Sequence, residues 1–180
     1  EDLRLTPASA QPHCASLSHS HSVALNLFTP STAGSDGSDA WCIAAWLQTC
    51  APNSEHTRRS YRREACRWLA FLTWIDLANQ ATVASDGVGR AHLIRTARYE
   101  DAGAYLEWVR GESDRGDLPE WLAQACGVSA AKPKATAIVL RHAVKVLNGM
   151  YEELGALSIG ATPVPVVAFN PFRPYRKQFN

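Results

Sequence analysis

The sequence lacks several features on which secreted proteins, membrane proteins and many enzymes depend. Its five cysteines are an odd number among 180 residues and include no C-x-x-C pair, so neither a disulfide framework nor a zinc site is indicated. It has no glycine-rich phosphate loop and no serine nucleophile elbow. No stretch approaches the length of a bilayer span, and no basic-then-apolar leader opens the chain. We therefore expect no cofactor, no metal and no membrane partner.

The positions of the histidines and cysteines agree with this expectation. His13, His19 and His21 lie near Cys14, but their spacing matches no tetrahedral ligand set, so a polar, unstructured segment is favoured there. Cysteines 42, 50 and 66 fall in helix-like stretches, where a reduced thiol behaves as a small apolar side chain. This usage predicts a reducing, cytoplasmic location.

The net charge of +1 hides a strong separation of charges along the chain. Residues 99–120 contain seven acids and two arginines, whereas residues 132–145 contain four basic residues and no acid. Since an electrostatic footprint is local, this separation says more about partners than the total does.

The apolar pattern predicts a small all-α fold, a bundle of four to five helices. Residues 1–37 are rich in Ser, Ala, Thr and Pro and are expected to be a flexible or extended N-terminal segment. Residues 38–173 form the expected domain, with an insertion at 111–133, and residues 174–180 begin a linker. Because the chain begins with Glu1 rather than Met, we expect it to be part of a longer protein.

Four helices are predicted at about 38–50, 54–76, 97–110 and 134–155. Ser38 is the expected N-cap of the first helix, Pro52 breaks that helix, Asn53 or Ser54 caps the second, and Gly155 ends the fourth. Trp121 and Leu122 are expected to anchor the insertion to the core. The inward positions are predicted to be Tyr61, Ala65, Trp68, Leu69, Leu72 and Ile75 in the second helix, Ala102, Tyr105, Leu106 and Val109 in the third, and Val139, Leu140, Ala143, Leu147, Met150 and Leu154 in the fourth.

Helical geometry places basic residues opposite these apolar stripes. At about 100° per residue, Arg59 and Arg63 fall outward on the second helix, and Arg58 lies nearer the core edge. The fourth helix likewise carries its basic residues opposite its apolar stripe, so two helices present basic ridges. This favours a surface that binds a polyanion over one that only faces solvent. The candidate contacts are Arg58, Arg59, Arg62, Arg63 and Arg67 of the second helix and Lys134, Arg141 and Lys145 of the fourth.

The six tryptophans mostly sit at core positions, which favours packing over stacking on the bases of a single strand. Double-stranded DNA is therefore the predicted partner.

The order of these motifs resembles the core-binding domain of tyrosine recombinases, the phage integrase family. "NSEHTRRSYRREACRWLAFLTW" is similar to the family's Ser-x-x-Thr-x-x-x-Tyr signature through Ser54, Thr57 and Tyr61, followed by Arg62, Arg63, Trp68 and Leu69. "RYEDAGAYLEWVRG" resembles its Asp-x-x-x-Tyr-Leu element. The helix around Arg141, Leu147, Tyr151, Leu154 and Gly155 resembles its closing helix, and "FNPF" at residues 169–172 resembles its terminal Asn-Pro.

The resemblance implies a SAM-like helical domain that forms half of a clamp on duplex DNA during integration or recombination. The full-length protein would act as a homo-oligomer on DNA, in the cytoplasm of a bacterium and associated with the nucleoid when it is on DNA. It also implies that the chemistry lies elsewhere, since the family's Tyr nucleophile and its Arg, Lys and His-x-x-Arg residues belong to a C-terminal catalytic domain. Only Pro174 to Asn180 follow Arg173, so we expect this chain to bind DNA without cutting it. "HTRR" at 56–59 and Tyr175 are not expected to be catalytic.

Two alternatives remain open at this stage. The chain would also suit a stand-alone helical DNA-binding regulator, or a protein-interaction module whose acidic segment 99–120 docks on a basic partner.

Overall fold

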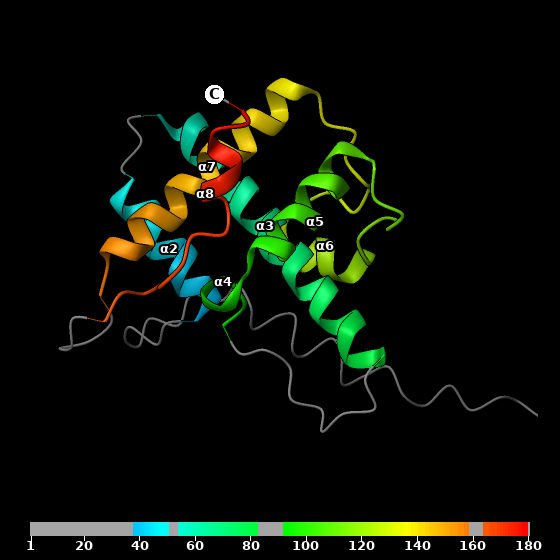
Figure 1. Ribbon diagram of the computed structural model, residues 1–180, viewed down its shortest axis with the longest axis horizontal. Helices are drawn as coiled ribbons and strands as arrows, with labels where there is room; N and C mark the ends of the chain where they lie inside the picture. Colours follow the sequence, from blue (N-terminus) through cyan, green and yellow to red (C-terminus); the bar gives the residue numbers. More distant parts are fainter. Residues whose placement is uncertain (1–37, 51–53, 83–91, 159–163, 180) are drawn as a thin grey trace, which may run out of the picture.

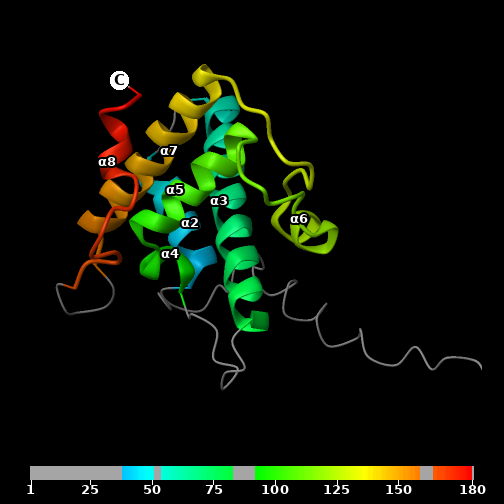
Figure 2. The ribbon, with the colours of Figure 1, turned by 45° about the vertical axis from the view of Figure 1, so that its right-hand side comes forward.

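The computed structural model describes residues 38–50, 54–82, 92–158 and 164–179. Within these ranges the protein is an all-α bundle, as predicted (Figures 1 and 2). The expected flexible segment 1–37, and with it the histidines near Cys14, lies outside the described residues, as do Pro52 and Asn53. The helices are α2 (Asp39–Thr49), α3 (Glu55–Thr82), α4 (Leu93–Thr96), α5 (Tyr99–Arg110), α6 (Glu120–Cys126), α7 (Ala137–Ala156) and α8 (Arg173–Arg176).

Helix α3 is the element around which the others pack (Figure 2). It continues past its predicted end near residue 76 and reaches Thr82. In its middle, consecutive side chains from Leu69 to Leu72 are all buried, because neighbouring helices cover α3 on several sides. The predicted inward stripe of α3 is confirmed, with Tyr61 only half-buried at its start.

Helices α2 and α4 are joined by a buried carboxylate. Ser38 caps α2 as predicted, with its Oγ accepting from the backbone N–H of Trp41 at 3.2 Å. The next residue, Asp39, accepts hydrogen bonds from the backbone N–H groups of Leu93 and Ile94 at 2.9 and 2.8 Å. These are N–H groups at the start of α4, which have no partner within that helix. His92, at φ 59°, makes the left-handed turn that presents them.

The third predicted helix is confirmed as α5, which begins at Tyr99 rather than near residue 97. The short α4, which the sequence pattern did not predict, precedes it, and the extended residues Ala97 and Arg98 separate the two helices. All four inward positions predicted for α5 are buried. One of them, Tyr105, belongs to an aromatic cluster around Trp68 of α3, in which the rings of Tyr105 and Phe172 meet the indole edge-on at 5.1 and 5.0 Å.

The insertion at 111–133 contains a helix that the sequence pattern did not predict. Helix α6 packs on α3, and its anchor Leu122 is fully buried as expected. Trp121 is 36% exposed, so its predicted role as a core anchor is wrong. The seven residues of α6 complete only two turns, and a single side, carrying Leu122 and Cys126, reaches α3.

Helix α7 begins later than predicted, at Ala137, with Thr136 as its N-cap. Its first turn projects beyond the bundle, so Val139 is 42% exposed and its predicted inward position is wrong. The remaining predicted core residues of this helix are buried. The helix also passes Gly155, the predicted terminator, and ends at Ala156 with Leu157 as its C-cap.

The segment after α7 returns along that helix to the core. Asn170 donates from Nδ2 to Oδ1 of the buried Asn148 at 3.1 Å and accepts at Oδ1 from the backbone N–H of Phe172. Phe172 is fully buried in the aromatic cluster. Residues 173–176, partly assigned above to a linker, form α8 against α7, and Arg176 pairs with Glu152 at 3.0 Å.

Candidate nucleic-acid interface

The first two turns of α3 carry a dense group of exposed cations. Arg59 and Arg63 are exposed, as the helical geometry predicted, and so are Arg62 and Arg58, although Arg58 was expected nearer the core edge. Arg59 makes an ion pair with Glu55 at 3.2 Å, but both side chains remain largely in solvent. Such a surface pair contributes little free energy, so it leaves the guanidinium available to another anion.

A polar and aromatic contact holds this part of α3 against α7. Ser60 Oγ lies 3.1 Å from His142 Nε2, a hydrogen bond between the two helices. Tyr61 stacks on Trp46 of α2 with centroids 5.7 Å apart and meets the ring of His142 at 6.3 Å. These contacts bring the arginines of α3 to the same end of the molecule as the first half of α7.

On α7, Arg141 and Lys145 are exposed and lie four residues apart, so they are neighbours on one face. We define the basic surface as these two residues and the four exposed arginines of α3, joined by the Ser60–His142 contact. Six of the eight residues that the sequence nominated are thus exposed on two helices that contact each other.

Arg67 does not share this surface. Its side chain is 18% exposed and donates to the carboxylate of Glu64, itself 2% exposed, at 3.1 Å. The sequence predicted an outward position, but α3 is covered on more sides at this level than a single apolar stripe implies. Burial raises the pKa of the neighbouring Tyr105 hydroxyl, and Glu64 raises it further, whereas Arg67 lowers it. Arg67 therefore neutralises a buried acid in the core.

Lys134 is exposed but does not belong to the helical band of Arg141 and Lys145, because α7 begins only at Ala137. It lies beside the turn that ends α5, where Gly111 adopts φ 84°, and a Cβ on that glycine would stand 3.5 Å from Lys134 Cγ. Its neighbour Ala135 donates its backbone N–H to the carbonyl of Val109 at 2.9 Å, which fixes the segment.

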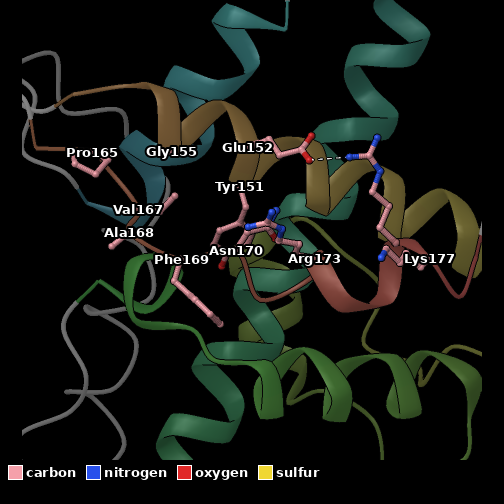
Figure 3. A pocket seen from close by; sticks show the side chains of 11 residues that line it. Tyr151, Glu152, Gly155, Pro165, Val167, Ala168, Phe169, Asn170, Arg173 and Lys177 are labelled. Atoms are coloured by element: carbon pink, nitrogen blue, oxygen red, sulfur yellow. Dashed lines mark hydrogen bonds and ion pairs between the residues drawn. The ribbon is translucent and has the colours of Figure 1, made fainter.

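A groove between the C-terminal half of α7 and residues 165–177 was missed by sequence reasoning (Figure 3). It encloses about 820 Å³, and Phe169, Arg173 and Lys177 are among the residues that line it. Arg173 and Lys177 have no ion-pair partner among the described residues. The three cations within "RPYRK" were the available signal, but proline-broken sequence has no periodicity from which a helix could be predicted.

Two kinds of side chain that often carry chemistry are clusters of metal ligands and thiols such as those of Cys66 and Cys126. The described residues contain no group of three His, Cys, Asp or Glu side chains placed to hold a metal ion. Burial raises the pKa of Cys66, and it raises the pKa of Cys126 to about 12, so both thiols stay protonated at neutral pH. Tyr175 packs against Gly103, and its hydroxyl donates to the backbone carbonyl of Tyr99 at 3.4 Å. That contact gives Tyr175 a packing role.

None of the helices in the described ranges combines the length and apolar character needed to cross a lipid bilayer. In comparisons with known proteins, no family model, no curated protein and no solved structure matches the chain.

Proposed function

We propose that the basic surface binds double-stranded DNA and that the chain is the core-binding domain of a tyrosine recombinase of the phage integrase type. One observation carries the DNA proposal. Four exposed arginines lie on α3 and two exposed cations, Arg141 and Lys145, lie on α7, and the two helices contact each other through Ser60 and His142. Several cations on one surface displace counterions condensed on phosphates, which produces strong, salt-dependent binding.

The distribution of aromatic side chains supports a duplex over a single strand as the partner. Trp46, Trp68 and Trp108 are buried in the core, where their rings cannot stack on bases. Near the basic surface, Tyr61 is occupied by its stack on Trp46. Binding would therefore depend on phosphate contacts and groove geometry, which a duplex supplies.

The recombinase part of the proposal rests on the motif resemblance. In the family, the helices corresponding to α3 and α7 lie on duplex DNA, and the same two helices carry the basic surface here. The Asn-Pro element at Asn170 also has a clear local role, since Asn170 joins the chain after α7 to Asn148. In the full-length protein, DNA cleavage and assembly into a homo-oligomer on DNA would involve a separate catalytic domain.

The test is a salt titration of duplex binding, measured by fluorescence anisotropy. For each of Arg59→Ala, Arg63→Ala, Arg141→Ala and Lys145→Ala, we expect weaker binding and a slope of log Kd against log salt reduced by about one. Arg115→Ala is the matched control, because it removes an exposed arginine from the acidic loop, where its guanidinium lies over Trp74.

Equal slopes in all five variants would show that the basic surface does not contact DNA. If the chain is instead a protein-interaction module, charge reversal at Glu112, Asp114 or Asp117 should weaken its binding to the protein partner. The same substitutions should not change the DNA titration. DNA binding with no associated recombinase activity in the full-length protein would favour the stand-alone regulator.

A further inference from the structure

The first turn of α7 exposes large apolar side chains beside the cations of the basic surface. Ile138 is 79% exposed, more than any other large hydrophobic residue in the described ranges, and its neighbour Val139 is 42% exposed. Single exposed apolar residues are common and need no explanation by themselves. The position of Ile138 sets it apart, because it lies on the outer face of a helix that carries two of the proposed DNA contacts.

Helical geometry places Ile138 on the same face as these cations. Arg141 follows it by three residues and Lys145 by seven, so the three side chains fall within about 60° of one another around α7. The core side of the helix begins only at Leu140, which is buried. The exposed face of α7 thus presents an isoleucine at its start and cations over the following two turns.

Charge complementarity identifies the partner that fits this face. The cations would hold α7 against phosphates, and the major groove of B-DNA is wide enough to admit an α-helix. Within that groove, the 5-methyl group of thymine is the apolar group that a base edge presents. A branched aliphatic side chain next to phosphate-binding cations is suited to contact that methyl group.

We infer that Ile138 contacts the 5-methyl group of a thymine in the major groove and gives the protein sequence preference at that base pair. This inference rests on the proposed DNA binding and adds to it. The cations supply affinity for any duplex, and Ile138 supplies discrimination between bases. Val139, less exposed and about 100° away around the helix, faces the edge of the same turn.

The experiment first selects preferred duplexes from a randomised library with the wild-type chain. Each thymine of the selected site is then replaced in turn by deoxyuridine, which lacks only the methyl group. We expect a roughly three- to fivefold loss of affinity, that of about one buried methyl group, at one thymine or two adjacent ones. In Ile138→Ala this loss should disappear, while affinity for a scrambled duplex and the salt slope stay within about twofold of wild type.

Leu77→Ala is the matched control, since it shortens another exposed apolar side chain at the far end of α3. It should retain the wild-type response to deoxyuridine. Circular dichroism melting establishes that both variants are folded.

Each remaining outcome overturns the inference in an identifiable way. If the library yields no preferred site, or if Ile138→Ala keeps the response to deoxyuridine, DNA binding stands and the role of Ile138 is wrong. If Ile138→Ala instead abolishes self-association of the protein in sedimentation experiments without altering the deoxyuridine response, the patch is a protein interface. If no duplex is bound in a salt-dependent way, the proposed function itself fails.

Discussion

The hydroxyl of Tyr151 connects three helices through two hydrogen bonds. It accepts from Trp68 Nε1 at 3.0 Å and donates to the backbone carbonyl of Ile94 at 2.9 Å. Burial raises the pKa of this hydroxyl, so it remains a donor throughout the accessible pH range. Asp39 makes a comparable link between α2 and α4, and these two side chains satisfy polar groups that would otherwise be buried without partners.

At the scale of single residues, we predict that the free energy of unfolding depends on pH through Asp39. Burial raises the pKa of its carboxyl above the ordinary value of 3.8, although the hydrogen bonds from Ile94 and Leu93 oppose the shift. The folded protein therefore holds the proton more tightly than the unfolded chain. The stability that protonation of Asp39 contributes is present below the unfolded pKa and is lost as pH rises through the folded pKa.

Urea denaturation of wild type and Asp39→Asn, at several pH values between about 3 and 7, measures this effect. We expect the free energy of unfolding of wild type, relative to the variant, to fall as pH increases. Asp76→Asn, at a half-buried position on α3, serves as the control. A difference that is constant with pH, or that grows as pH rises, would contradict the assignment to Asp39.

The exposure of the candidate site residues was predictable where a helix has a single buried face, and it was not predictable elsewhere. Arg59 and Arg63 face solvent as their spacing requires. Arg67 does not, because whether a position is covered depends on which helices lie nearby, and that is a property of tertiary packing. Lys134 was placed wrongly on a helix because Thr136, the true N-cap, resembles any other polar residue in a loop.

Among the elements, the segment from Val166 to Phe172 does more than connect α7 to α8. Val166 accepts at its carbonyl from Arg95 Nε at 2.9 Å and donates its N–H to the Leu157 carbonyl at 2.8 Å. Phe172 then inserts its ring against Trp68 and Tyr105. The proline-containing sequence of this region has no helical period, so it did not predict that Phe172 completes the core.

We predict that Phe172→Ala lowers the free energy of unfolding by about 3–5 kcal/mol, because it leaves a cavity in the aromatic cluster. Phe169→Ala is the matched control, since Phe169 is 39% exposed and its ring packs on the exposed ring of Tyr99 at 4.3 Å. It should cost about 1 kcal/mol. Equal losses in chemical denaturation would mean that Phe172 is not a core residue.

The long helices were predictable and the short ones were not, for a physical reason. Helices α2, α5 and α7 repeat an apolar stripe over several turns, which fixes their existence within a few residues. Helices α4, α6 and α8 are four to seven residues long, too short to show a period. They form because Asp39, Leu122 and Phe172 attach them or their flanking residues to the bundle.

At the scale of the whole molecule, charge is sorted between two regions. The basic surface lies on the first halves of α3 and α7, while acids such as Glu107, Glu112 and Asp114 follow α5 into the loop before α6. Because the charges are segregated, the electrostatic potential differs between these two regions even though the net charge of the protein is only +1.

We predict that duplex DNA stabilises the whole domain, since it would bind the folded state alone. At a free duplex concentration about one hundred times Kd, the free energy of unfolding should rise by about 2.7 kcal/mol, which corresponds to a Tm higher by roughly 5–10 °C. Differential scanning fluorimetry at low and high salt measures the shift, which should vanish at high salt.

The double variant Arg63→Ala/Lys145→Ala should show a much smaller shift in Tm at the same duplex concentration. An undiminished shift in this variant would locate DNA binding on another surface, and the groove lined by Arg173 and Lys177 would be the next to examine.

The contact between Phe172 and Trp68 also has a consequence for synthesis on the ribosome. The two rings touch, yet they lie far apart in the sequence. Translation therefore delivers α3, α5 and α7 before the ring that fills the space among them. Until Phe172 has left the ribosome, the incomplete bundle would expose the aromatic rings that Phe172 later covers. A chaperone that binds exposed apolar surface would recognise this state. The core of this domain is therefore completed only after the residues that follow α7 have been synthesised.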